Sequence, residues 1–122
     1  DKEASLHEAR CKLFARAEII PPHIGLDHLL DAEEAQLVRD NFRNFLMADI
    51  DGSGEIEGVP PELVQRIIDE VCSAGDFNDI DREIERYREF ERAGLTDLAI
   101  RVFDDPWDSL RVIGKRVIPH FQ

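Results

Sequence analysis

The chain has 122 residues, of which 43% are hydrophobic and 34% are charged, a composition typical of one ordinary soluble domain. Its 27 acidic residues outnumber 15 Lys and Arg, and the formal charge of −12 repels nucleic-acid phosphates and anionic lipid headgroups. We therefore expect neither nucleic acid nor a membrane as a partner, and no segment approaches the roughly 20 apolar residues of a membrane span.

Two amphipathic helices are predicted before residue 50. Residues 3–20 place apolar side chains at intervals of three and four, and two prolines end this pattern. A second helix follows Asp31, which can cap its first turn while Glu34 answers three residues later. Cys11 and Cys72 lie among apolar neighbours, which predicts reduced core thiols and a cytoplasmic location.

A loop is predicted between residues 49 and 58, the segment densest in glycine. Its residues match the first eight positions of an EF-hand calcium loop, with oxygen-bearing side chains at Asp49, Asp51, Ser53 and Glu55. Position twelve, where a glutamate should close the coordination sphere, is Pro60. Two alternatives stay open: a non-catalytic EF-hand-like calcium-binding or interaction module, and a polar surface loop.

The rest of the chain predicts three helices and one strand. The first helix begins at Pro61 and stops at Gly75, and the second runs from its cap Asp76 to Gly94. The strand covers residues 97–103, where Leu98, Ile100 and Val102 face one side and the residues between them face the other. The last helix is capped by Asp105 and closed by Pro119.

A single apolar strand cannot satisfy its own backbone N–H and C=O groups, so its partner strands must lie outside this sequence. Helix, strand and helix in succession are the unit of a parallel α/β sheet. The chain also begins at Asp1 without a methionine. We therefore expect a segment of a longer polypeptide.

Four motifs in the second half carry a resemblance to a known family. They are Val59 to Val64, Ser73 to Asp76, Tyr87 to Phe103, and Asp105 to Pro119. In this order and spacing they resemble the carboxyl end of the luciferase-like monooxygenases, the family of bacterial luciferase and its deazaflavin-dependent relatives. The family's turn usually has proline where this chain has Phe77.

The resemblance implies an α/β fold in which residues 59–122 are the closing part of a TIM (β/α)₈ barrel, preceded by a helical segment at residues 1–58. It implies a flavin- or deazaflavin-dependent oxidoreductase or monooxygenase whose cofactor is FMN or a deazaflavin. The partner would be the missing amino-terminal barrel strands or another chain that supplies them, and a homo-oligomer stays open. We expect the isolated chain to be inactive and to bind no cofactor, because most of the barrel site is absent.

No residue of the sequence is catalytic by its pattern, and no Cys and His spacing predicts a metal site. Arg101 is the one candidate for a cofactor or substrate contact. It lies on the side of the predicted strand opposite Leu98 and Ile100, and this side would point into the barrel. A guanidinium there must meet a carboxylate or an anionic ligand, and both alternatives stay open.

Overall fold

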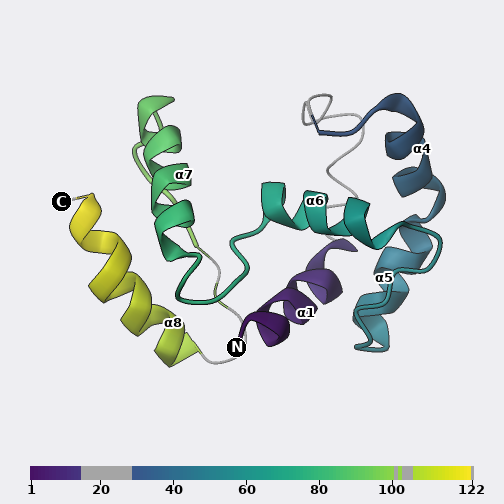
Figure 1. The fold of residues 1–122 in the computed structure, drawn as a ribbon, viewed down its shortest axis with the longest axis horizontal. Coiled ribbons are helices and arrows are strands. Elements are labelled where there is room, and N and C mark those ends of the chain that lie inside the picture. Colours follow the sequence, from purple (N-terminus) through teal and green to yellow (C-terminus); the bar gives the residue numbers. More distant parts are fainter. Residues whose placement is uncertain (15–28, 101, 103–105, 122) are drawn as a thin grey trace. The chain divides into compact units, whose positions relative to one another are not determined.

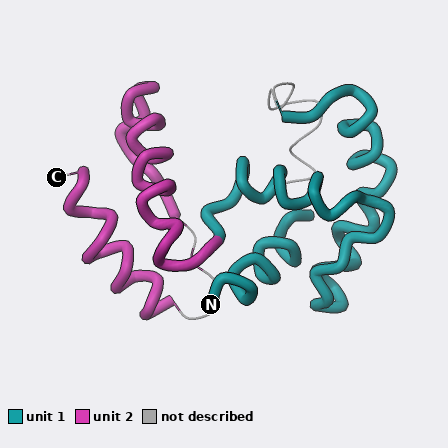
Figure 2. Tube along the Cα trace, viewed as in Figure 1, with its two compact units in different colours: residues 1–74 teal, residues 75–122 magenta. Residues whose placement is uncertain are grey.

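The structure is a computed structural model that describes residues 1–14, 29–100, 102 and 106–121. The chain divides into two compact units, residues 1–74 and residues 75–122 (Figure 2). The predicted boundary at residue 58 differs from this division, because helix α6 (Pro61–Val71) belongs to the first unit. Within the described residues, no helix is long and apolar enough to cross a lipid bilayer.

Four helices build the first unit: α1 (Lys2–Lys12), α4 (Ala32–Asp40), α5 (Phe42–Ile50) and α6 (Figure 1). The predicted capping box at the start of α4 is confirmed. Asp31 Oδ1 accepts the Glu34 amide at 2.8 Å, and Glu34 Oε2 accepts the Asp31 amide at 3.1 Å. The predicted helix over residues 3–20 is confirmed as far as Lys12, and residues 15–20 lie outside the described range.

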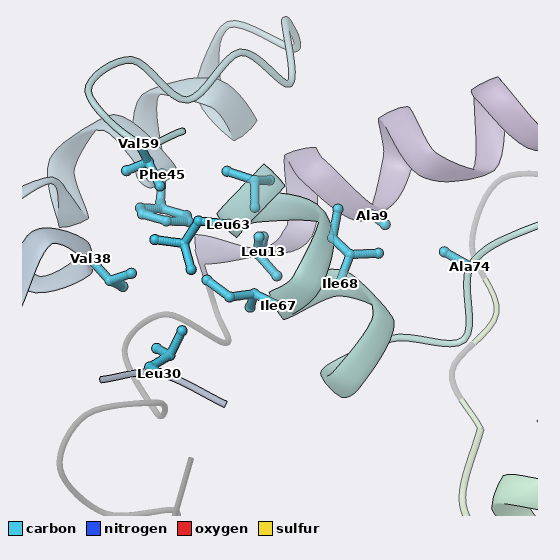
Figure 3. Packing of buried hydrophobic residues seen from close by; sticks show 11 residues of the cluster. Ala9, Leu13, Leu30, Val38, Phe45, Val59, Leu63, Ile67, Ile68 and Ala74 are labelled. Atoms are coloured by element: carbon cyan, nitrogen blue, oxygen red, sulfur yellow. The ribbon is translucent and has the colours of Figure 1, made fainter. Parts of the chain in front are cut away.

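The core of the first unit forms around one face of α6. Leu63, Val64, Ile67 and Ile68 are buried there because they recur at helical spacing on one side of the helix. Figure 3 shows Leu63, Ile67 and Ile68 among the buried residues of the neighbouring helices. Those neighbours are Ala9 and Leu13 near α1, Val38 of α4, Phe45 of α5, and Leu30, Val59 and Ala74 in the connecting segments.

Arg66, on the exposed side of α6, ties the segment before α4 to this core. Its guanidinium donates to Glu34 Oε1 at 2.8 Å and to the Leu29 carbonyl oxygen. This guanidinium, together with the Asp31 amide, holds the pKa of Glu34 below its ordinary value. The carboxylate of Glu34 therefore both caps α4 and anchors that helix to α6.

In the second unit, α7 (Ile80–Arg92) is followed by α8 (Pro106–Val112), the π-helix η2 (Ile113–Val117) and the 3₁₀-helix η3 (Ile118–His120). The predicted end of α7 at Gly94 is confirmed. Gly94 adopts φ 96°, and the Leu95 amide donates to the Phe90 carbonyl at 3.0 Å. This bond and that of the Gly94 amide to Glu91 form a Schellman cap.

Several predicted helix boundaries are wrong: the helix after Asp31 is divided at Asn41 into α4 and α5, and the last α-helix ends at Val112 and not at Pro119. Asp76 is not the N-cap of α7, because residues 76–79 form a turn in which Asp79 Oδ2 accepts the Asp76 amide at 2.9 Å, and α7 begins after Asp79. The helix from Pro61 ends at Val71, with Cys72 as an extended C-cap, before it reaches Gly75. The predicted cap of the last helix, Asp105, lies outside the described residues.

The predicted strand over residues 97–103 is wrong in the part that the structure describes. Residues 97–100 and 102 are in neither a strand nor a helix, and the described residues contain no sheet. Alternating side chains favour a strand only when a second strand accepts and donates the ladder hydrogen bonds, and no described segment does so. The α/β class and the TIM (β/α)₈ barrel fragment are therefore overturned: the described fold is helical.

Two glycines of the loop after α5, Gly52 and Gly58, differ in how closely other side chains pack against them. Gly52 and Gly58 have φ of 69° and 80°, so alanine is strained at both. A Cβ at Gly58 would also overlap the side chain of Asn41, whereas nothing lies near one at Gly52. Asn41 Nδ2 donates to the Leu37 carbonyl at 2.9 Å, so displacing it disturbs the end of α4.

We predict that Gly52→Ala lowers the free energy of unfolding by about 1 kcal/mol, the strain of a left-handed alanine. Gly58→Ala should lower it by about 2 to 4 kcal/mol, because the overlap with Asn41 adds to that strain. Urea denaturation followed by circular dichroism measures both changes. Equal losses in the two variants would contradict the contact with Asn41.

Candidate functional site

The glycine-rich loop between α5 and α6 is the first candidate site. Asp49, in the last turn of α5, accepts Lys12 Nζ of α1 at 2.7 Å. Asp51 Oδ1 accepts the Ser53 amide at 2.9 Å, and Ser53 Oγ accepts the Glu55 amide at 3.1 Å. The amide and hydroxyl of Ser53 hold the pKa of Asp51 below its ordinary value. The side-chain oxygens of Asp49, Asp51 and Ser53 thus already accept hydrogen bonds, from Lys12 and from the backbone amides of the loop itself.

The calcium ligands of the EF-hand-like alternative are not gathered around one point. The first of them, Asp49, is paired with a lysine. The twelfth position, Pro60, is the N-cap of α6 and offers no carboxylate. In the part of the chain that the structure describes, no group of three or more His, Cys, Asp and Glu is placed to hold a metal ion. The geometry favours the alternative of a surface loop.

Cys11 and His7 are neighbours on α1, with Sγ and Nε2 separated by 3.7 Å. Burial raises the pKa of the Cys11 thiol, and the nearby Glu8 carboxylate raises it further. A reactive cysteine needs the opposite shift, toward the thiolate. This pair therefore lacks the electrostatic setting of a Cys-His nucleophile, and Cys11 and Cys72 are both free thiols.

Arg101, the one predicted contact to a cofactor or substrate, lies outside the described residues. Both of its alternatives, an ion pair with a carboxylate and a contact with an anionic ligand, stay predictions. Its neighbours Ile100 and Val102 are described, and they belong to the second candidate site.

An apolar groove of about 450 Å³ runs through the second unit. Three parts of the unit line it: the end of α7, the extended segment 95–102, and the helical stretch from α8 to η3. The lining side chains of α7 include Tyr87 and Phe90, whose ring centroids are 6.4 Å apart. Those of the carboxyl-terminal stretch are Leu110, Ile113, Val117, Ile118 and Phe121.

The extended segment supplies the third wall of the groove. Leu98, Ile100 and Val102 all line it, together with the consecutive residues 95–97, although no strand forms in the described part of the segment. The Schellman cap places Leu95 against the same opening. Leu95, Leu98 and Ile100 remain 50%, 45% and 40% exposed, so the groove is lined but not filled.

The backbone amides of residues 96–100 have no described backbone partner. The two charged residues that line the groove, Glu91 and Asp97, are both acidic. Sequence reasoning missed this site, although more apolar side chains lie in residues 95–121 than so short a segment can bury by itself.

Comparison of the chain with family models, with characterised proteins and with solved structures found no match. The function must therefore be inferred from the geometry of the two candidate sites.

Calcium titration separates the two interpretations of the loop. We predict no saturable heat up to about 1 mM Ca²⁺, the range of the weakest EF-hand-type modules, because the closing carboxylate is missing. Lys12→Gln, which releases Asp49, should still show none. Saturable binding by the unmodified chain that disappears in Asp49→Ala would contradict this and support the calcium-binding alternative.

Proposed function

We propose that the chain acts by binding another polypeptide through the groove of residues 75–122. The observation that carries this proposal is the poor burial of the unit's apolar side chains. Among its described residues, Ile84 is the one fully buried apolar side chain, while Phe90, Leu95, Leu98, Ile100, Leu110, Ile118 and Phe121 are all exposed. Units of roughly 50 residues are marginal even when their apolar surface is well buried, so this one gains stability from a cover.

A polypeptide suits the groove better than a small apolar ligand. A small molecule could fill the volume, but it would leave the exposed amides of residues 96–100 bonded to solvent. A peptide chain offers apolar side chains for the groove and carbonyl oxygens for those amides. Extended peptides bind sheet edges with main-chain hydrogen bonds for affinity and pockets for alternate side chains, and here residues 96–100, which belong to no sheet, would supply the main-chain partners.

Peptide selection on the intact 122-residue chain tests the proposal. Peptides enriched from a random displayed library should bind Leu98→Arg at least about tenfold more weakly, because the new guanidinium enters the apolar groove. Phe77→Arg is the matched control, since Phe77 is 65% exposed in the same unit and does not line the groove. Fluorescence anisotropy measures both affinities.

Two outcomes would contradict the docking proposal. Either no peptide family is enriched, or the enriched peptides bind Leu98→Arg as tightly as the unmodified chain.

A second candidate function follows from the resemblance to the luciferase-like monooxygenases. We propose that the polypeptide partner is the remainder of a luciferase-like oxidoreductase that uses FMN or a deazaflavin. The supporting observation is that two of the four resembling motifs, Tyr87 to Phe103 and Asp105 to Pro119, supply every described residue that lines the groove except Phe121. A partner that bound there would bring the two motifs and the cofactor-binding part of the enzyme together.

Flavin titration tests this second candidate. The isolated chain should not bind FMN stoichiometrically, whereas FMN or a deazaflavin should co-purify with the chain and its partner. In that complex, Arg101→Ala should weaken flavin binding while Arg92→Ala, which removes an arginine paired with Glu85 at 2.8 Å, should not. Tight FMN binding by the isolated chain, or a partner complex without flavin, would remove the oxidoreductase and leave polypeptide docking intact.

A further inference from the structure

The charge at the groove indicates which kind of polypeptide fits it, an inference that rests on the docking function proposed above. Glu91 of α7 and Asp97 of the extended segment line the groove, and no Lys or Arg among the described residues does. Asp97 accepts the Thr96 hydroxyl at 2.9 Å, and no Lys or Arg of the described ranges forms an ion pair with it.

Two arginines of α7 that flank Glu91 in the sequence, Arg88 and Arg92, have partners of their own. Arg92 Nη2 lies 2.8 Å from Glu85 Oε1, and this hydrogen bond is the main reason why the pKa of the Arg92 guanidinium is raised. Arg88 Nη1 lies 3.6 Å from the same carboxylate, and its Nη2 donates to His120 Nδ1 at 3.3 Å. Both cations thus pair with other groups on α7 and η3, and the exposed Glu91 carboxylate contributes only in a minor way to the raised pKa of Arg92.

We propose that the occupant of the groove is an extended segment of another protein with alternate apolar side chains and Lys or Arg at its flanks. Its backbone pairs with residues 96–100, its apolar side chains enter beside Leu98 and Ile100, and its cations lie against Glu91 and Asp97. Burial supplies most of the affinity, while the opposite charges fix the register and raise the association rate.

A second copy of this chain is a poorer occupant. A symmetric pair formed through the groove would bring the same two carboxylates of both copies to one interface. Each copy also carries a formal charge of −12, so association works against long-range repulsion. An acidic or nucleic-acid partner meets the same repulsion, and an uncharged segment gains nothing from the acidic rim.

Three synthetic peptides test the proposal with the intact 122-residue chain. They share the core Val-Thr-Phe-Thr-Leu and carry two Lys, two Gln or two Glu at each end. In fluorescence anisotropy at low ionic strength, the Lys-flanked peptide should bind at least about fivefold more tightly than the Gln-flanked one, and the Glu-flanked one more weakly still. Added salt should remove most of this difference.

Matched variants separate a local effect from net charge. Glu91→Gln with Asp97→Asn should bring the Lys-flanked and Gln-flanked peptides within about twofold of each other. Glu33→Gln with Glu62→Gln changes the net charge equally at exposed sites of the first unit, and should preserve the preference. Hydrogen exchange should show residues 96–100 protected by the Lys-flanked peptide.

The possible failures are distinct. Equal affinity for the Lys-flanked and Gln-flanked peptides, or a preference that survives Glu91→Gln with Asp97→Asn, overturns the charge inference and leaves docking in place. Binding without protection of residues 96–100 overturns the extended mode. If none of the three peptides binds, the charge inference fails, and peptides selected from the random library then decide whether docking itself fails.

Discussion

Burial of one face of α6 is the constraint on which residues 1–74 depend. Leu63, Val64, Ile67 and Ile68 reach 5% exposure or less, and the buried residues of α1, α4 and α5 pack around them. Truncating one such side chain in a core typically costs about 2 to 5 kcal/mol, a large part of the stability of a small domain. The polar features of the unit act on this frame. Arg66 and Glu34 position α4, and Asn41 and Gly58 fix the path of the loop into α6.

Residues 75–122 contain no equivalent of that face. The most buried side chains among their described residues are Ile84 and the charged Glu83, whose carboxylate pairs with Arg82 and Arg86 at 3.1 and 3.2 Å. Ion pairs of this kind contribute little net stability compared with well-packed apolar side chains. The apolar residues of this unit instead line an open groove. The two units therefore differ in how well their apolar side chains are buried and not in how many they have. For this reason we propose that the second unit binds a partner.

The features that could be predicted from the sequence are those decided within a few residues. The capping box of Asp31 and Glu34, the left-handed end of α7 at Gly94 and the loop at residues 49–58 all follow from local chemistry. The cap of α7 was misplaced because Asp76 and Asp79 both suit such a position, and only the hydrogen bond between them decides.

The strand and the groove could not be predicted in the same way, because each depends on what lies opposite. Leu98, Ile100 and Val102 all line the groove, but alternating side chains form a strand only beside another strand. The surroundings of the calcium-like motif could not be predicted for a related reason. Its spacing is local, whereas the pairing of Asp49 with Lys12 joins residues 37 positions apart.

The backbone amides of residues 96–100, which have no described backbone partner, also affect the tendency of this chain to aggregate in concentrated solution. An unpaired backbone beside apolar side chains is a template for aggregation, and natural proteins protect such edges with charged gatekeeper residues. Glu91 and Asp97 occupy that position here, and the whole chain adds a formal charge of −12. This protection is electrostatic, so it weakens as the pH falls toward the isoelectric point near 4.6, where copies no longer repel one another. The carboxylates of Glu91 and Asp97 thus help to keep copies of the chain apart in solution whenever no partner occupies the groove.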